Sequence, residues 1–427
     1  MSRAIMTLLT VLTLGAAHGQ TSSGQELSLT TCKEEARANF PAIKQYDLVE
    51  KSREMNVSNA SKAWMPKVSL TGFGTAFTDI VDLPQQASQI IGEMKNGVYG
   101  ASLSIQQVIY DGGAIAAKKR MQEAQADVSL RLIDVNLYEI NERIEQLFFG
   151  ILMLDEQAKQ NHLLQEDLAL SENTVRSLMN SGMANQGDLD AVRVTQIQVR
   201  QQELSIMTTR QTYLQMLGLF IAKELGDETT LALPDDLMMT ESTDAEATDD
   251  PSARPEMLLY ASQEKMLDAQ KKTQDAQLRP TLSAFGIGSA HNEVLSSAKS
   301  FNAIGGISLT WNIGALYTRR NDVALIENQR AQVATQRETF LFNNKMENRL
   351  ANGKIESLRQ QMALDDEAIA LRESIRQKAE KKVQNGTETV NELLRDVNAV
   401  NEARQQKAIH KIQLLQEAYR QKTLNNN

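Results

Sequence analysis

The stretch from Ala114 to Leu225 contains no proline, and apolar residues recur along it at spacings that average 3.5 residues. This pattern places side chains on one stripe of an α-helix and is typical of helices that supercoil around partners. The arm from Ala114 to Ser181 would be about 100 Å long. No compact domain needs so long a helix, so the pattern predicts an antiparallel helical hairpin with its tip near Gly182. The apolar positions are Leu130, Ile133, Leu137, Ile140, Ile144, Leu147, Ile151 and Leu154, and then Val192, Val199, Ile206, Tyr213 and Phe220.

The composition favours long helices over a set of globular cores. The chain has 427 residues, but only 5% are aromatic and only 7 are proline. Such a composition fits extended helical segments. The net charge of −9 argues against a nucleic-acid partner, because nucleic-acid-binding chains carry a basic surface.

Residues 1–19 have the pattern of a secretory signal peptide. Arg3 supplies the positive start, Ile5 to Leu14 the apolar run, and Ala17-His18-Gly19 the small-residue cleavage site. The alternative, an N-terminal membrane anchor, is less favoured because the run is too short to span a bilayer. No later segment has eighteen consecutive apolar residues, so any membrane crossing would use strands. Cys32 is the only cysteine, so no intramolecular disulfide forms.

The chain repeats itself, which predicts one structural design used twice. We divide it into a first repeat at 20–253 and a second at 254–427. Three pairs of motifs are offset by 214 residues and a fourth by 204. The pairs are Asn39–Ala42 with Ala253–Glu256, Trp64–Ser69 with Leu278–Ser283, Gly72 and Gly74 with Gly286 and Gly288, and Asn180–Gly182 with Gln384–Gly386.

Both repeats have the same predicted order of elements. A helix comes first, at Leu29 to Ala63 and again at Pro255 to Gln277. A strand hairpin follows at 67–110 and at 281–313, and a long helical hairpin at 114–225 and at 316–425. An acidic linker at 226–253 joins the halves, with a short strand predicted at Leu231 to Leu233; its nine Asp and Glu face no Lys or Arg.

The strand hairpins alternate between apolar and polar residues, which predicts a sheet with one face of each kind. Apolar residues are Tyr99, Ala101, Leu103 and Ile105 in the first repeat, and Ile307, Leu309, Trp311 and Ile313 in the second. Polar loops at Thr78 to Gly97 and Asn292 to Ala303 are bracketed by these strands.

Strands of about ten residues suit a bilayer core, because tilted membrane strands need roughly nine to eleven. Four strands cannot close a membrane barrel, which needs at least about eight, and open edges cannot face lipid. We therefore predict a mostly α protein with a membrane β-barrel. A trimer would form a twelve-stranded β-barrel, four strands per chain, continued by a long α-helical coiled-coil barrel. Polar residues would line the lumen and apolar residues would contact lipid. The alternative fold is a soluble β-sandwich beside a coiled coil.

These features together resemble the TolC family of outer-membrane efflux and secretion ducts over nearly the whole mature chain. The resemblance depends on the duplicated architecture and on several short motifs in order. The motifs are the strands that follow Pro66 and Pro280, the turn Tyr110-Asp111-Gly112-Gly113, the opening Arg254-Pro255-Glu256, and the tips Gly182–Leu189 and Gly386–Leu393.

The resemblance implies a homotrimer in outer-membrane lipid whose helical tips meet a periplasmic adaptor, or membrane fusion, protein fed by an inner-membrane pump. The residues implied in adaptor docking are Gly182, Met183, Ala184, Gly386, Thr387 and Glu388. Asp188 and Glu392 match positions of a periplasmic constriction. From the residues alone, both are also negative charges at the start of a helix, with Asp188 as a candidate N-cap.

Two departures from the family pattern stand out. Gly314-Ala315 replaces the aromatic-Asp-Gly-Gly turn, which predicts a remodelled junction. Glu388 occupies a position where some members carry an arginine that latches the closed end, so that latch is not expected here.

The sequence contains no set of residues that indicates catalysis, a cofactor or a metal. Apart from the signal peptide, the histidines are His162, His291 and His410, and no pair has metal-ligand spacing. Soft-metal export by the 17 methionines is an alternative, but they are scattered, as in helix packing. The chain is therefore expected to be an exit duct and not an enzyme. The alternative function is a periplasmic coiled-coil structural or adaptor protein without a pore.

Overall fold

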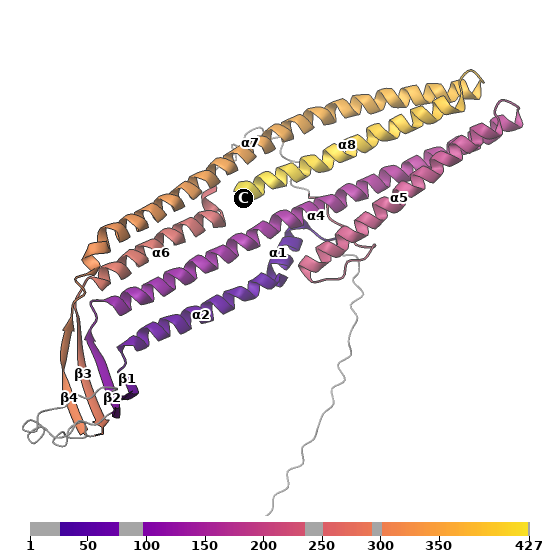
Figure 1. Cartoon of the computed structure of the whole chain (residues 1–427). Coiled ribbons are helices and arrows are strands. Elements are labelled where there is room, and N and C mark those ends of the chain that lie inside the picture. The colour runs from indigo at the N-terminus through magenta and orange to yellow at the C-terminus, as the bar shows by residue number, and fades with distance from the viewer. Residues whose placement is uncertain (1–25, 77–96, 235–250, 293–300, 426–427) are drawn as a thin grey trace, which may run out of the picture.

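The computed structural model describes residues 26–76, 97–234, 251–292 and 301–425. The predicted signal peptide, nearly all of the first polar strand-connecting loop, and most of the second loop and of the acidic linker lie outside these ranges. Within them the chain is long and narrow, with a small sheet at one end and two helical tips at the other (Figure 1). The predicted fold class, mostly helical with four antiparallel strands, is confirmed.

Two long helices run the length of the body, and each turns back at a tip into a shorter helix. The first, α4, has 67 residues, which is roughly 100 Å and agrees with the proline-free pattern. Its predicted stripe is the packed face: Ile144 and Ile151 are fully buried. The helices are α4 (Ala114–Asn180), α5 (Gln186–Ile221), α6 (Pro255–Gln277), α7 (Ala315–Gln384) and α8 (Val390–Asn425).

The helix predicted at Leu29 to Ala63 is broken, so that expectation was wrong. Helix α1 (Leu29–Asn39) ends before Pro41, a 3-10 turn covers Pro41–Ile43, and α2 (Lys44–Ser61) follows. Proline disfavours helical geometry in the residue before it, and Phe40 is extended, with φ −63° and ψ 133°. The break lets α1 pack beside α5 while α2 follows α4 toward the sheet.

The four strands form one antiparallel sheet in the order β1-β2-β3-β4. The last strand ends earlier than predicted, because Trp311 turns its indole N–H to the carbonyl of Leu278, at 3.0 Å. Ile313 also lies outside the strand, whereas Phe301 lies inside it. The strands are β1 (Lys67–Ala76), β2 (Gly97–Tyr110), β3 (Thr281–His291) and β4 (Phe301–Thr310).

The register gives the sheet two different faces. Residues paired across strands share a face, so Leu70, Leu103 and Gly288 lie together on one, and Ser69, Ser104 and Ile287 on the other. The first face is apolar almost throughout. The second carries most of the serine and threonine residues of the strands, together with a few apolar residues such as Phe73 and Ile287. The apolar face includes Val68, Leu70, Tyr99, Ala101, Leu103, Ile105, Leu282, Ala284, Ala290, Phe301, Ala303, Ile307 and Leu309.

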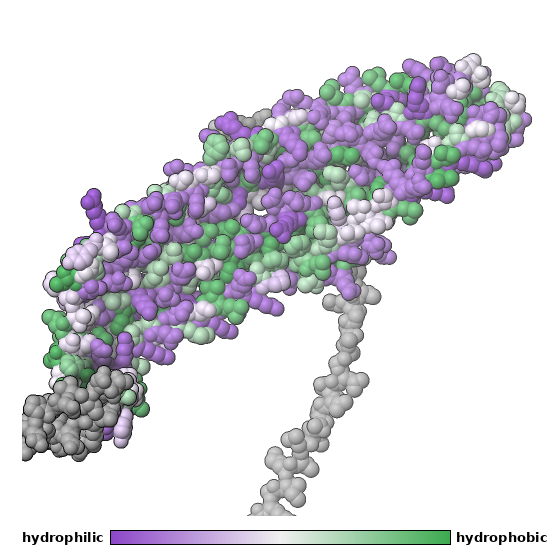
Figure 2. All heavy atoms as spheres, viewed as in Figure 1, coloured by the Kyte–Doolittle hydropathy of each residue, from purple (hydrophilic) through white to green (hydrophobic). Residues whose placement is uncertain are grey.

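The helices lie side by side in one layer whose order matches that of the strands. Near the sheet the order is α2, α4, α6 and α7. Toward the tips α5 takes the place of α2, and α8 that of α6. Two apolar clusters hold the layer, one around Phe148 and Phe149 in the middle and one around Leu168 and Val192 near the tips. Hydrophobic residues gather over the strands and the middle of the body, whereas the tip half is mainly hydrophilic (Figure 2).

The junction between β2 and α4 uses glycine geometry that its counterpart lacks. Gly112 and Gly113 have φ values of +66° and +90°. The buried Asp111 carboxylate accepts from the backbone N–H groups of Gly113 (2.9 Å) and Ile115 (2.6 Å), which caps α4. At the corresponding junction Gly314 has φ −59°, so the junction is remodelled as predicted.

Gly112→Ala is expected to lower the thermal stability of the folded protein by about 1–2 kcal/mol or more, whereas Gly314→Ala is expected to be neutral or slightly stabilising. A Cβ at Gly112 would lie 2.7 Å from Cβ of Arg279 and would force a strained φ. Thermal unfolding followed by the helical circular-dichroism signal measures both variants. Equal effects would contradict this account of the junction.

Candidate functional site

The first tip ends α4 with a glycine in the left-handed conformation. Gly182 has φ +75°, and its N–H donates to the carbonyl of Met179 at 3.0 Å. The N–H of Met183 donates to the carbonyl of Leu178 at 2.8 Å. These two bonds form a Schellman motif, which satisfies the carbonyls at the helix end.

The second tip repeats this geometry. Gly386 has φ +70°, and its N–H donates to the carbonyl of Val383 at 2.9 Å. The N–H of Thr387 donates to the carbonyl of Lys382, also at 2.9 Å. Gly182 and Gly386 therefore end their helices with positive φ, as the sequence predicted.

The returning helices both begin with a capping box. Asn185 caps α5: its side chain accepts from the N–H groups of Gly187 and Asp188, and Asp188 accepts from the N–H of Asn185 at 2.9 Å. Thr389 caps α8 in the same way: Glu392 accepts from its N–H at 3.1 Å, and its hydroxyl accepts from the N–H of Glu392 at 3.3 Å. Asp188 is therefore the third residue of its helix and not the N-cap, which corrects the earlier expectation.

The two capping residues were not identified from the sequence, although the signal was present. Asn-x-x-Asp at Asn185 and Thr-x-x-Glu at Thr389 both fit the capping-box pattern. Their presence explains why a carboxylate and then a leucine recur six and seven positions after each tip glycine. The carboxylate completes the box, and Leu189 and Leu393 are buried in the cluster beneath the tips.

The carboxylate of Glu392 is held in its charged form. Hydrogen bonds from the backbone and hydroxyl of Thr389 lower the pKa of Glu392, and the nearby charges of Arg395 and Lys382 add smaller effects in the same direction. Arg395 thus acts at a distance, and Thr389 is the hydrogen-bonded partner. Glu388 faces Lys382, with 3.6 Å between the carboxylate oxygen and Nζ.

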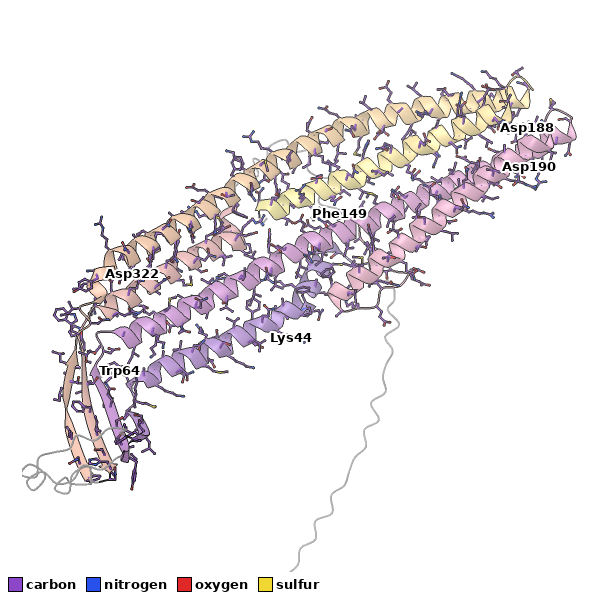
Figure 3. The ribbon with its side chains drawn as sticks, viewed as in Figure 1. Lys44, Trp64, Phe149, Asp188, Asp190 and Asp322 are labelled. Atoms are coloured by element: carbon purple, nitrogen blue, oxygen red, sulfur yellow. The ribbon has the colours of Figure 1, made fainter. Side chains whose placement is uncertain are left out.

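The two tips lie next to each other. A Cβ at Gly386 would lie 3.7 Å from Sδ of Met183, whereas no atom lies within 4 Å of a Cβ at Gly182. Met183 is also half exposed. Asp188 lies at the start of α5, beside the first tip (Figure 3). All six predicted docking residues and both predicted constriction residues thus lie at one end of the molecule.

Ion pairs join the two hairpins behind the tips. Asp167 on α4 lies 3.2 Å from Arg376 on α7 and 3.9 Å from Arg404 on α8. Arg404 also pairs with Glu373 on α7 at 2.6 Å. The hairpins are therefore held together at this end by charge as well as by the apolar cluster around Val192.

The described residues include no group of three or more His, Cys, Asp and Glu that could hold a metal ion. Within the same residues, no helix combines the length and apolar character needed to cross a bilayer. His410 lies in the body, where its Nδ1 is 2.6 Å from a carboxylate oxygen of Asp365.

Solved structures with the same fold include outer-membrane channels. The structure aligns with OprN at a TM-score of 0.72 and 12% identity, covering 93% of this chain and 90% of OprN. It aligns with CusC at a TM-score of 0.71 and 14% identity, covering 93% of this chain and 91% of CusC. It aligns with CmeC of Campylobacter jejuni at a TM-score of 0.67 and 13% identity, covering 100% of this chain and 93% of CmeC. No curated protein matches the sequence significantly.

Residues 33–220 match the model of a protein family described as outer membrane efflux protein. This segment runs from α1 to the end of α5 and includes the first tip. The sequence match thus covers most of the first repeat, and the likeness over the rest of the chain is one of fold.

Proposed function

We propose that three copies of this chain form an outer-membrane exit duct of a tripartite efflux or type I secretion system. Residues 1–19 direct export. The strands close a barrel in outer-membrane lipid, and the helices extend into the periplasm. The tips receive cargo from a periplasmic adaptor and an inner-membrane pump. The observation that carries the proposal concerns the two outer edges of the described layer of strands and helices. Each edge lacks a partner there, and the two have similar strand lengths and similarly placed apolar residues.

Each edge of the sheet is a strand with one side unpaired. Among the strands that the structure describes, β1 pairs only with β2, and β4 pairs only with β3. The two edges have comparable lengths, at 10 residues each. Backbone groups on such edges cannot face lipid unpaired, so β4 of one copy must pair with β1 of the next.

The outer helix at the β4 edge has a second apolar stripe. Phe342, Met346 and Leu350 on α7 are exposed and spaced four residues apart. They lie on the side opposite the buried Asn344 and Asn348, because a shift of two residues turns a helix by about 200°. The stripe continues toward the tip with Leu364, Leu371 and Ile375. A helix with apolar stripes on opposite sides needs partners on both.

The outer helix at the opposite edge has the same property. On α5, Leu204 and Leu219 are exposed and lie opposite the buried Val192 and Val199. The exposed apolar residues of α5 and α7 lie at similar distances along their helices from the tips. Leu204 on α5 and Leu364 on α7 both lie 22 residues from their tip glycines. Ile197 and Leu371 each lie 15 residues away, and Leu219 and Leu350 lie 37 and 36 away.

These two edges differ from each other, so contact between copies is head-to-tail and generates a ring. Two copies would supply only the smallest barrel, of about eight strands, filled by its own side chains. Three copies supply twelve strands and a lumen. The polar face of the sheet then lines the lumen, and the apolar face contacts lipid.

Leu204→Cys combined with Leu364→Cys is expected to give covalent dimers and trimers, but no larger species, on a non-reducing gel. The stripes bring these positions together between neighbouring copies, and a closed ring of three stops the ladder. Cys32 gives no background, because it is fully buried. The measurement is mild oxidation of outer membranes followed by electrophoresis.

The matched control is Leu204→Cys with Leu350→Cys, which differ in height by about 14 residues, or roughly 21 Å. This pair should not cross-link. Equal cross-linking of both pairs, or a ladder that continues past three copies, would contradict the closed trimer. Recovery of the protein only from the soluble periplasmic fraction would favour the alternative, a coiled-coil structural or adaptor protein without a pore.

The predicted mouth is tested by replacing its carboxylates. Because glutamine also serves in a capping box, Glu392→Gln removes the charge and keeps the cap. Rings of carboxylates favour cations. The trimer in planar bilayers should therefore prefer cations, and Glu392→Gln should weaken this preference. Since the pKa of Glu392 is lowered, the preference should persist as pH falls through the usual glutamate range, and be lost below it. Unchanged selectivity in Glu392→Gln combined with Asp188→Asn would mean that these carboxylates only cap helices.

The docking role of the first tip is tested by Gly182→Trp against Gly182→Ala. Both replacements carry the same cost of positive φ, about 1 kcal/mol or more, so they differ only in bulk. Space at Gly182 is open, so the trimer should form with either side chain. Cross-linking to the adaptor should be lost with Trp and kept with Ala. Unimpaired cross-linking in Gly182→Trp would refute the docking role.

A further inference from the structure

Three apolar side chains gather at one place on the more polar face of the sheet, which elsewhere also carries Phe73 and Val108. Ile287 on β3 is paired with Ile304 on β4, so the two side chains lie on the same face. Their neighbours across and along the strands on this face include Ser104 and Asn302. Ile287 is 41% exposed and Ile304 66% exposed. The pair therefore presents its apolar surface to whatever occupies that side of the sheet.

Phe285 extends this patch along β3. It lies two residues from Ile287 and is paired with Gly306, and its ring covers that glycine. A Cβ at Gly306 would lie 3.1 Å from Cζ of Phe285 and 3.2 Å from Cε1. The missing side chain makes room for the ring. Phe285, Ile287 and Ile304 thus form one continuous surface, which we call the inner-wall patch.

We propose that the inner-wall patch is a binding site on the wall of the lumen for the alkyl or aromatic part of small amphiphilic cargo. This inference rests on the proposed function, because it needs the polar face of the sheet to line the lumen. Each trimer would carry three such sites, set among hydroxyl-bearing side chains.

Cross-strand pairing alone does not explain the patch. An Ile–Ile pair and a phenyl ring over glycine stabilise adjacent strands. However, that purpose is served equally well on the apolar face, where lipid removes the cost of exposing such groups to water. In an aqueous lumen, contact between these adjacent apolar side chains and an apolar group of a ligand is favourable, because it removes apolar surface from water.

The ligand class follows from the surroundings of the patch. Within the register of the described strands, Ile287 and Ile304 are bordered by the hydroxyl and amide groups of Ser104, Ser289 and Asn302, and no carboxylate lies among these neighbours. The polar part of a ligand would therefore remain hydrated, and its apolar part would decide binding. Each methylene group that becomes fully buried should strengthen binding about fourfold.

The test compares tetrabutylammonium with tetramethylammonium, which carry the same charge and differ only in alkyl length. The reporter is Asn302→Cys, an exposed position on the same face as the patch. A sulfonated, membrane-impermeant thiol reagent labels it in reconstituted vesicles. Cys32 contributes no background, because it is fully buried and its burial raises the pKa of its thiol to about 11.

Tetrabutylammonium is expected to slow labelling of Asn302→Cys about tenfold, which corresponds to partial burial of a few methylenes. Tetramethylammonium at the same concentration should have little effect. Adding Ile287→Thr and Ile304→Thr should abolish the protection, since threonine keeps the branched shape and adds a hydroxyl. Equal slowing by both ions, or protection that survives the threonine replacements, would overturn the inference.

Ile307→Cys is the matched control for orientation. It lies on the same strand as the reporter but on the apolar face. It should escape the reagent with or without either ion. Labelling of Ile307→Cys in place of Asn302→Cys would mean that the faces are reversed, and would overturn the proposed barrel together with the inference. Labelling at Asn302→Cys without protection would overturn the inference alone.

Discussion

Backbone N–H and C=O groups on a strand edge must find hydrogen-bond partners before the strand can enter lipid. The described part of the chain provides four strands, and each of the two outer strands is paired on one side only. Because one helix accompanies each strand, α2 beside β1 and α7 beside β4, the same constraint fixes where the helices of neighbouring copies meet. The second apolar stripes on α5 and α7 lie at these edges. Strand pairing and helix packing between neighbouring copies therefore both favour the same ring.

The tips follow a different rule, because in the proposed duct they lie in water and their backbone groups need no partner chain. Their order comes from local hydrogen bonds: a Schellman motif ends each long helix, and a capping box starts each return. The same carboxylates that complete the boxes lie at the mouth of the proposed duct. Completing a capping box and lining a charged opening are compatible roles for Glu392, since the hydrogen bonds from Thr389 that complete the box also lower the pKa of Glu392 and favour its ionised form.

Much of this fold could be predicted from the sequence, because its signals are local. The proline-free heptads located α4, and the glycines at Gly182 and Gly386 located both turns. The errors came from competition between signals. Pro41 broke a helix that the surrounding pattern favoured, and the alternation through Trp311 continued past the end of β4 because the indole bonds to Leu278 instead. The exposed apolar stripe of α7 could not be predicted from the sequence. Leu364 is recognised as exposed only when the structure shows which face of the helix is buried. The inner-wall patch likewise depends on the register that pairs Ile287 with Ile304.

The central claim is that this chain is complete only as a closed ring of three in the outer membrane. Native mass spectrometry of the protein extracted from outer-membrane fractions in mild detergent tests it most directly. The account predicts a single assembly with three times the mass of the mature chain, and no free monomer at concentrations where the assembly persists. A stable monomer, or a distribution of open oligomers without a preferred size, would contradict it.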